Sequence, residues 1–330
     1  MSVNRRTLIK AAGAAPLGLA LPAHGRPRPP VTVRVATPFA AGHILADTAL
    51  RFKELLEAET RGRLVVEVAT SVLNEQTINP AMAPCEPAER VADIVLTGGQ
   101  PIQDYAPAYF FFNGPYVIRD YAHFQRVWRS HLGDEARALV RTGGNLVSLG
   151  TVYRGFRQFT ANRAIVTPAD LAGIRLRLPP VPDWVAVWSA LGAVPVQVPL
   201  TGIYEALRTG VAEASEGDLT QISSLRLFEV QSHLALTGHL VGFGLVAANA
   251  CFLRDVPWPD KVRRAMRKAT EWGSAFMADR EAALLGELET AGMTVVTPDA
   301  AAIEAAARPA IEQLFATTWN VTTWDEVLAI

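Results

Sequence analysis

The feature that most constrains the fold is a strand–helix–strand succession between residues 31 and 68. Val31-Thr-Val-Arg-Val-Ala36 alternates as a strand does, and Leu64-Val-Val-Glu-Val68 is a second strand. Between them, residues 44–60 repeat apolar side chains at helical spacing, and Gly62 supplies a stop. This order predicts a right-handed crossover and a parallel sheet with helices on its faces. The fold class is therefore expected to be α/β.

The first predicted strand leads into a loop that ends at His43. Ligands of parallel sheets gather outside the carboxyl ends of the strands, which places this loop near a potential site. His43 has two interpretations: it caps the helix or lies on the surface, or it contacts a ligand.

The length of 330 residues predicts two domains. We expect the first crossing between them at Gly150–Arg154, directly after a strand at residues 146–150. A helix from Pro259 to Leu288 would extend roughly 40 Å. It would lie against both domains and limit their relative motion.

Charge and motifs exclude several classes of function. Lys and Arg number 31 against 32 Asp and Glu, and no basic stripe occurs, so we expect no nucleic-acid partner. The chain has no GxSxG, no HExxH, no phosphate-binding glycine loop and no Cys/His cluster. Glu205 and Glu213 have no third group to orient them. We therefore expect neither an enzyme nor a cofactor, and no residues are predicted as metal ligands. The sequence leaves open whether a metal ion bridges the ligand.

The start of the sequence has the features of an export signal. Asn4-Arg-Arg-Thr-Leu-Ile-Lys10 is followed by a short apolar stretch rich in Ala and Gly, and the paired arginines are typical of twin-arginine export. We expect residues 1–25 to be a signal peptide and the remainder to be periplasmic. No other segment is long and apolar enough to span a membrane.

The only two cysteines, Cys85 and Cys251, are far apart and lie outside any CxxC motif. They are either small buried apolar residues or one disulfide formed in an oxidising compartment. The sequence leaves both interpretations open.

Arginines in apolar strands are the candidate binding residues. Arg175 and Arg177 lie two apart, so in a strand they project from the same face. A buried arginine needs an anion, and its planar fork matches a carboxylate. Arg157, upstream in a second strand-like run, could converge on the same acid. Alternatively, Arg175 and Arg177 are edge-strand charges paired with Asp170 or Asp183.

Five segments carry a resemblance to a known family. They are Gly155-Phe-Arg-Gln-Phe-Thr160, Thr167-Pro-Ala-Asp-Leu-Ala-Gly-Ile-Arg-Leu-Arg-Leu-Pro179, Leu191-Gly-Ala-Val-Pro195, Tyr204-Glu-Ala-Leu-Arg-Thr-Gly-Val211 and Phe228-Glu-Val-Gln231. In this order and spacing, the chain resembles the solute-binding proteins of TRAP (tripartite ATP-independent periplasmic) transporters, the DctP type. The resemblance covers most of residues 33–300.

The resemblance implies a two-lobed periplasmic binding protein fold, in which each lobe is a mixed sheet flanked by helices and a long helix spans both lobes. Lobe I would comprise residues 31–153 and 242–281. Lobe II would comprise residues 154–241 and 282–330. Between them the family captures a ligand by closure and delivers it to a membrane permease.

The same resemblance makes Arg177 the principal clamp on a ligand carboxylate and Arg157 a second contact. We expect both guanidinium groups to point into the gap between the lobes with no acid of the protein neutralising them. The family's ligand-facing asparagine is replaced here, because Gly217 and Asp218 occupy that corner. Asp218 either pairs with an arginine or accepts a hydrogen bond from the ligand. The glutamate that sialic-acid binders carry near Gly98 is absent, which argues against that ligand.

Phe243 lies between two glycines at the expected hinge and either stacks on a ligand or belongs to the core. The expected ligand-binding residues are Arg157, Arg177, Gly217, Asp218, Phe243 and His43. The function expected from the resemblance is that of a monomeric receptor that binds a small organic acid and hands it to TRAP permease subunits. A periplasmic sensor that signals to a partner, or a periplasmic enzyme on the same architecture, are the alternatives.

Overall fold

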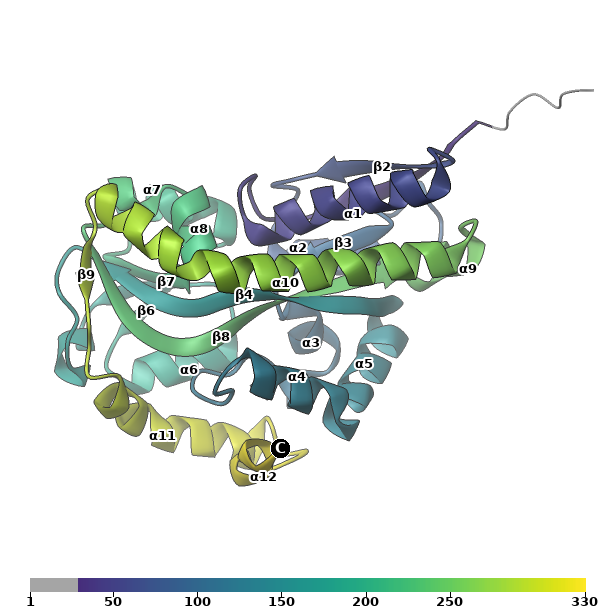
Figure 1. Ribbon diagram of the computed structural model, residues 1–330. Coiled ribbons are helices and arrows are strands. Elements are labelled where there is room, and N and C mark those ends of the chain that lie inside the picture. Colours follow the sequence, from purple (N-terminus) through teal and green to yellow (C-terminus); the bar gives the residue numbers. More distant parts are fainter. Residues whose placement is uncertain (1–28) are drawn as a thin grey trace, which may run out of the picture.

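The computed structural model describes residues 29–330, and their strands form one nine-stranded sheet (Figure 1). The expected signal peptide at residues 1–25 lies outside the described residues. The strand order is β2-β1-β3-β8-β4-β7-β5-β6, with β9 beside β8. The strands are β1 (Val31–Ala36), β2 (Leu64–Ala69), β3 (Ile94–Thr97), β4 (Leu146–Ala161), β5 (Arg175–Leu178), β6 (Val194–Gln197), β7 (Ala214–Asp218), β8 (His233–Asn249) and β9 (Thr294–Val296).

Helices cover both faces of this sheet (Figure 1). They are α1 (Ile44–Thr60), α2 (Glu75–Ile78), α3 (Gln100–Tyr105), α4 (Tyr121–Arg129), α5 (His131–Gly144), α6 (Pro182–Ala190), α7 (Ile203–Arg208), α8 (Leu219–Ser224), α9 (Ala250–Asp255), α10 (Pro259–Thr290), α11 (Ala300–Thr317) and α12 (Trp324–Ala329). Within residues 29–330, no helix combines the length and the apolar composition that a membrane crossing requires.

The β1-α1-β2 unit confirms the predicted crossover. β1 and β2 pair in parallel, and α1 spans the predicted residues 44–60. His43 caps its N-terminus, while Arg61 and Gly62 adopt left-handed backbone conformations that end it. The apolar stripe of α1 is fully buried at Leu45 and Phe52, so the helix is held by packing against the sheet.

Strands β4 and β8 pair antiparallel along their length and join the two halves of the molecule. On one side lie β2, β1 and β3, and on the other β7, β5 and β6. The register of β4 shifts between Tyr153 and Gly155, a bulge that bends the strand. Gly155 has φ 86°, and a Cβ there would meet the side chains of Met277 and Glu281 at 3.0 and 2.9 Å. The bulge lies beside the predicted crossing at residues 150–154.

Helix α10 runs along the sheet from the side of α8 to α9 (Figure 1). Its 32 residues give a length of roughly 48 Å at 1.5 Å per residue. Glu281 accepts hydrogen bonds from the backbone N–H of Phe156 at 2.9 Å and from the hydroxyl of Tyr153 at 3.0 Å. The helix is therefore tied to β4 on both sides of the bulge.

The end of the chain returns to the first half. His123 Nε2 lies 2.9 Å from the Val327 carbonyl oxygen, and Arg126 donates to the carbonyl of Ile330 at 2.8 Å. These contacts dock α12 onto α4 (Figure 1). The sequence placed residues 282–330 in lobe II, whereas their last helix packs on an element assigned to lobe I.

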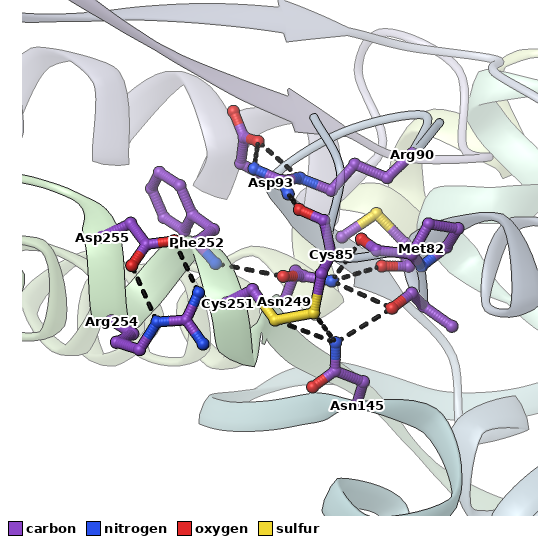
Figure 2. Close-up of a disulfide and its surroundings, with 12 residues drawn as sticks. Met82, Cys85, Arg90, Asp93, Asn145, Asn249, Cys251, Phe252, Arg254 and Asp255 are labelled. Atoms are coloured by element: carbon purple, nitrogen blue, oxygen red, sulfur yellow. Dashed lines mark hydrogen bonds and ion pairs between the residues drawn. A yellow bond between two sulfur atoms is a disulfide. The ribbon is translucent and has the colours of Figure 1, made fainter. Parts of the chain in front are cut away.

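Cys85 and Cys251 form a disulfide, which decides between the two interpretations of these residues (Figure 2). The bond fastens the irregular segment before β3 to the start of α9. Asn249 reinforces the junction, since its amide donates to the carbonyl of Met82 at 2.8 Å and that of Pro84 at 3.0 Å. Asn145 adds a hydrogen bond to the carbonyl of the residue between them, at position 83. Such a bond is typical of an oxidising compartment.

Candidate functional site

A narrow, buried cavity lies between the two halves. The halves touch beside it, because the indole N–H of Trp184 donates to the carbonyl of Asn113 at 2.7 Å. The cavity is lined by Glu75, Gly98, Gly99, Gln100, Asn113, Arg154, Arg157, Arg177, Pro179, Trp184, Gln221, Gly242 and Phe243. Three buried guanidinium groups and one buried carboxyl group thus face a single enclosed space.

Arg177 is the unmatched cation of this cavity. It lies on β5, an inner strand between β7 and β6, and is 2% exposed. Its Nε donates to the Val198 carbonyl at 2.8 Å, but among the described residues its two terminal nitrogens have no hydrogen-bond partner and no carboxylate lies within 4 Å. Burial lowers the pKa of Arg177 to about 10, so it stays charged at neutral pH. A buried charge in this state calls for an anion.

Arg157 corrects the expectation that both arginines are free of protein acids. Its Nε and Nη2 pair with the two carboxylate oxygens of Glu216 at 2.5 and 2.7 Å. The sheet causes this, because β4 lies beside β7 and places Arg157 opposite Asp218, two residues from Glu216 on one face. Burial opposes ionisation of Glu216, but Arg157 and His239 lower its pKa to about 2. Nη1 of Arg157 makes no hydrogen bond among the described residues and lies 3.9 Å from Asp218.

Asp218 pairs with Arg154, which the sequence analysis did not single out as a binding residue. Nε and Nη2 of Arg154 contact Oδ2 of Asp218 at 3.1 and 2.7 Å. The other oxygen caps α8, accepting from the backbone N–H of Gln221 at 2.9 Å and from the hydroxyl of Thr220. The attraction of Arg154 overcomes burial and holds the pKa of Asp218 well below its usual range. Of the two interpretations of Asp218, the structure has the arginine pair.

His43 caps α1 from within the core. Its Nδ1 accepts the backbone N–H of Leu45 at 3.1 Å, and its ring stacks on Phe39 with centroids 4.0 Å apart. Nε2 lies 3.6 Å from Oδ1 of Asp218, just beyond hydrogen-bond distance. Burial lowers the pKa of His43 to about 4, so the ring is neutral at pH 7. His43 stands behind Asp218 and is not among the residues that line the cavity.

Of the predicted binding residues Phe243 and Gly217, only Phe243 lines the cavity. Phe243 stacks on Phe124 with centroids 4.4 Å apart and is 1% exposed, yet it also lines the cavity. Gly217 does not line it. A Cβ at Gly217 would come within 2.6 Å of the amide nitrogen of Gln221, which does line the cavity. The glycine therefore leaves room for the Gln221 side chain.

Two hydrogen-bond acceptors from the first half of the molecule, Glu75 and Gln100, line the cavity and were not among the predicted binding residues. Glu75 lies on α2 and is buried; its Oε1 accepts only the backbone N–H of Gly98, at 3.2 Å. Burial raises the pKa of Glu75. Gln100 opens α3 and is 3% exposed, and its Oε1 has no hydrogen-bond partner among the described residues. The double glycine before Gln100 was the only sequence signal near this group.

A larger and more open hollow lies at the N-terminal end of β5. Arg175 lies there with Glu213, 3.4 Å away, and both side chains are nearly half exposed. Such ion pairs are screened by water, and the buried residues that line this hollow, Ile174, Leu207 and Ala212, are all apolar. The cavity between the two halves, lined by buried charged groups, is therefore the better candidate site. In residues 29–330 no three His, Cys, Asp or Glu side chains group as metal ligands would.

Comparison with known proteins gives a family match over most of the chain. Residues 35–318 match the family described as bacterial extracellular solute-binding protein, family 7, or DctP. A solute-binding protein of Roseobacter denitrificans is 30% identical over 267 residues, which is 80% of each chain. The C4-dicarboxylate-binding periplasmic protein DctP of Rhodobacter capsulatus is 25% identical over 297 residues, 88% of this chain and 87% of its own.

Solved structures share the fold. The Roseobacter denitrificans protein, crystallised with bound L-galactonate, has a TM-score of 0.80 at 26% identity and covers 90% of this chain and 98% of its own. A TRAP periplasmic solute-binding protein of Shewanella oneidensis with bound succinate has a TM-score of 0.83 at 21% identity, covering 91% and 99%. The expected two-lobed α/β fold is thereby confirmed.

Proposed function

The chain belongs to family 7 of the bacterial extracellular solute-binding proteins, the DctP family, and from this premise we propose that it captures a small organic acid through Arg177 for a TRAP transporter. The family resemblance drawn from the five sequence segments is confirmed, and with it the class of periplasmic solute-binding protein. That the chain catalyses no reaction of its own belongs to the proposal. The identity of the acid and of the permease belongs to the proposal.

The observation that carries the proposal is the unmatched charge of Arg177. Arg154 and Arg157 have carboxylate partners in Asp218 and Glu216, whereas Arg177 has none within 4 Å among the described residues. Its free terminal nitrogens form the planar fork that binds a carboxylate with two parallel hydrogen bonds. Nη1 of Arg157 is a further donor at the cavity. One ligand carboxylate would accept hydrogen bonds from these free donors of Arg177 and Arg157.

Capture proceeds by closure of the two lobes, which we propose comprise residues 31–153 with 242–281 and residues 154–241 with 282–330. The last helix of the second lobe, α12, also contacts α4 of the first. The bulge at Gly155 and the helix α10 support this division, because both lie where the halves meet. A ligand that contacts both lobes favours the closed form, since only that form makes all the contacts. We further propose that the receptor is a monomer and that its permease recognises the closed form.

The proposal is tested by thermal unfolding of the purified protein against mono- and dicarboxylates, sugar acids and aromatic acids. A ligand at 100 times its Kd stabilises the folded state by about 2.7 kcal/mol. We expect at least one aliphatic acid to raise the Tm of the wild type and not that of Arg177→Met. No stabilisation by any acid, or equal stabilisation of both proteins, would refute the assignment.

A further inference from the structure

Two acceptor groups from the first half of the molecule lie together over Gly98. A Cβ at Gly98 would collide with Oε1 of Gln100, and it would come within 2.5 Å of Oε1 of Glu75. Both oxygens therefore crowd the same point on the cavity wall. Glu75 has one donor, the Gly98 N–H, and Oε1 of Gln100 has none among the described residues. Buried acceptors in this state need donors from elsewhere.

The charged groups of the cavity differ in whether they have an ion-pair partner. Two of the three arginines are matched by Asp218 and Glu216, which leaves Arg177 to receive one carboxylate. Glu75 has no cation within 4 Å among the described residues. It comes from α2 in the first half, whereas Arg177 comes from β5 in the second. A second ligand carboxylate beside Glu75 would meet a like charge and two acceptor oxygens, and the guanidinium group nearby, that of Arg154, is already paired with Asp218.

We propose that Glu75 and Gln100 are specificity-determining residues that select a monocarboxylic acid carrying hydroxyl groups beyond its carboxylate and reject dicarboxylates. The inference rests on the proposed function, since it assumes that Arg177 holds the carboxylate. Hydroxyl groups of the ligand donate to Oε1 of Gln100 and to the carboxyl group of Glu75. The protein thus supplies cations at one end of the ligand and acceptors at the other.

A ligand ammonium group is disfavoured at the same place. Nη1 of Arg154 lies 3.2 Å from the point where a Gly98 Cβ would stand, beside the two acceptor oxygens. A cation docked on Glu75 would therefore face this guanidinium group. A hydroxyl group supplies the missing donor without adding a charge. Burial also raises the pKa of Glu75, as expected for a carboxylate that is short of donors.

The test uses acids matched in chain length. Calorimetry at pH 7 compares D-erythronate with succinate and 4-aminobutanoate, and L-galactonate with adipate. We expect the wild type to bind the preferred hydroxy acid at least 10-fold more tightly than the dicarboxylate of equal length. Glu75→Gln replaces an acceptor by an amide that can donate to a second carboxylate, so this ratio is expected to fall at least 5-fold.

Two further variants keep the test decisive. Gln100→Leu removes the other acceptor and is expected to weaken hydroxy-acid binding at least 5-fold while succinate binding stays the same. Glu86→Gln, which removes an exposed carboxylate that does not line the cavity, serves as the control and should leave every ratio unchanged. Thermal unfolding of the ligand-free variants checks that each is folded.

The outcomes separate the two proposals. Tighter binding of a dicarboxylate or of 4-aminobutanoate by the wild type overturns the selectivity inference and leaves the acid receptor standing. The same holds if neither Glu75→Gln nor Gln100→Leu changes the ratios. If the wild type binds none of these acids, nor any acid of the wider screen, the proposed function fails and the inference fails with it.

Discussion

Trp184 and Asn113 come from opposite halves of the molecule, both line the cavity, and a hydrogen bond of 2.7 Å joins the indole nitrogen to the backbone carbonyl oxygen. The guanidinium group of Arg157 also lies over the ring of Trp184, with Cζ 5.0 Å from the ring centroid. One side chain therefore links the contact between the lobes to the binding residues.

Replacing Trp184 by Phe is predicted to weaken ligand binding by about 1 kcal/mol, roughly 5-fold, because the closed form loses one hydrogen bond while the aromatic packing on Arg157 remains. Calorimetry with the acid identified by screening measures the effect. Small-angle scattering of the ligand-free protein should show a larger radius of gyration for the variant. An unchanged affinity would mean that this bond does not contribute to closure.

Replacing Arg177 by Met is predicted to have opposite effects on binding and on stability. Binding should weaken by about 2–5 kcal/mol, since the ligand carboxylate loses its buried partner. The free energy of unfolding of the ligand-free protein should not decrease, because an unmatched buried charge is removed while the packing is kept. Arg175→Met, two residues away and exposed, is the matched control and should leave affinity unchanged. Equal losses of affinity in both variants would contradict the assignment.

Breaking the pair between Arg157 and Glu216 is predicted to destabilise the fold. Glu216→Gln leaves Arg157 buried without its carboxylate, which should cost about 3–5 kcal/mol of unfolding free energy in urea titrations. The double variant Arg157→Met, Glu216→Leu should recover most of this loss, because neither charge is then left alone. Additive losses would show that the two residues act independently.

The buried His43 predicts a loss of stability in mild acid. Its pKa is about 4 in the folded protein and 6.5 in the unfolded chain, so between these values only the unfolded chain takes up the proton. Stability therefore falls as the pH drops through this window, by about 2 kcal/mol from this group between pH 7 and pH 5.

His43→Asn retains a helix-capping acceptor and removes the titrating ring. Denaturant unfolding at pH 7 and pH 5 should give a smaller difference for this variant than for the wild type. The neighbouring acids Asp218 and Glu216 have lowered pKa values and titrate mainly below pH 4.5, outside the range compared here. Identical pH profiles would show that His43 is not the group responsible.

The disulfide is predicted to stabilise the folded protein considerably. Cys85 and Cys251 are 166 positions apart. In the entropic model, a cross-link that closes a loop of this size lowers the entropy of the unfolded chain and raises its free energy by up to about 5 kcal/mol. Cys85→Ser with Cys251→Ser should lower the free energy of unfolding by about 2–5 kcal/mol. Wild-type protein unfolded with a reductant provides the comparison and should match the double variant.

The sequence predicted the elements whose signals are local. The alternation in β1, the helical spacing of α1 and the long run of α10 each arise within one segment, and the structure has all three. The buried arginine on β5 followed from its apolar neighbours and from the family resemblance. Charge pairing was the part that failed, because it depends on which strands become neighbours.

Arg157 and Glu216 are 59 residues apart, and only the adjacency of β4 and β7 brings them together. Glu75 was missed for a related reason. It lies in a short helix of an irregular segment without periodicity, and its role depends on where Gly98 lies in space. The disulfide could not be chosen from two distant cysteines, since a pairing rests on a distance that no spacing encodes.

The continuity of β4 and β8 through the whole sheet has a mechanical consequence. An isolated half would contain only part of β4 and of β8, and β3 and β7 would lose hydrogen-bonded neighbours along the cut. The proposed opening and closing of the lobes would therefore bend these two continuous strands at the bulges of β4.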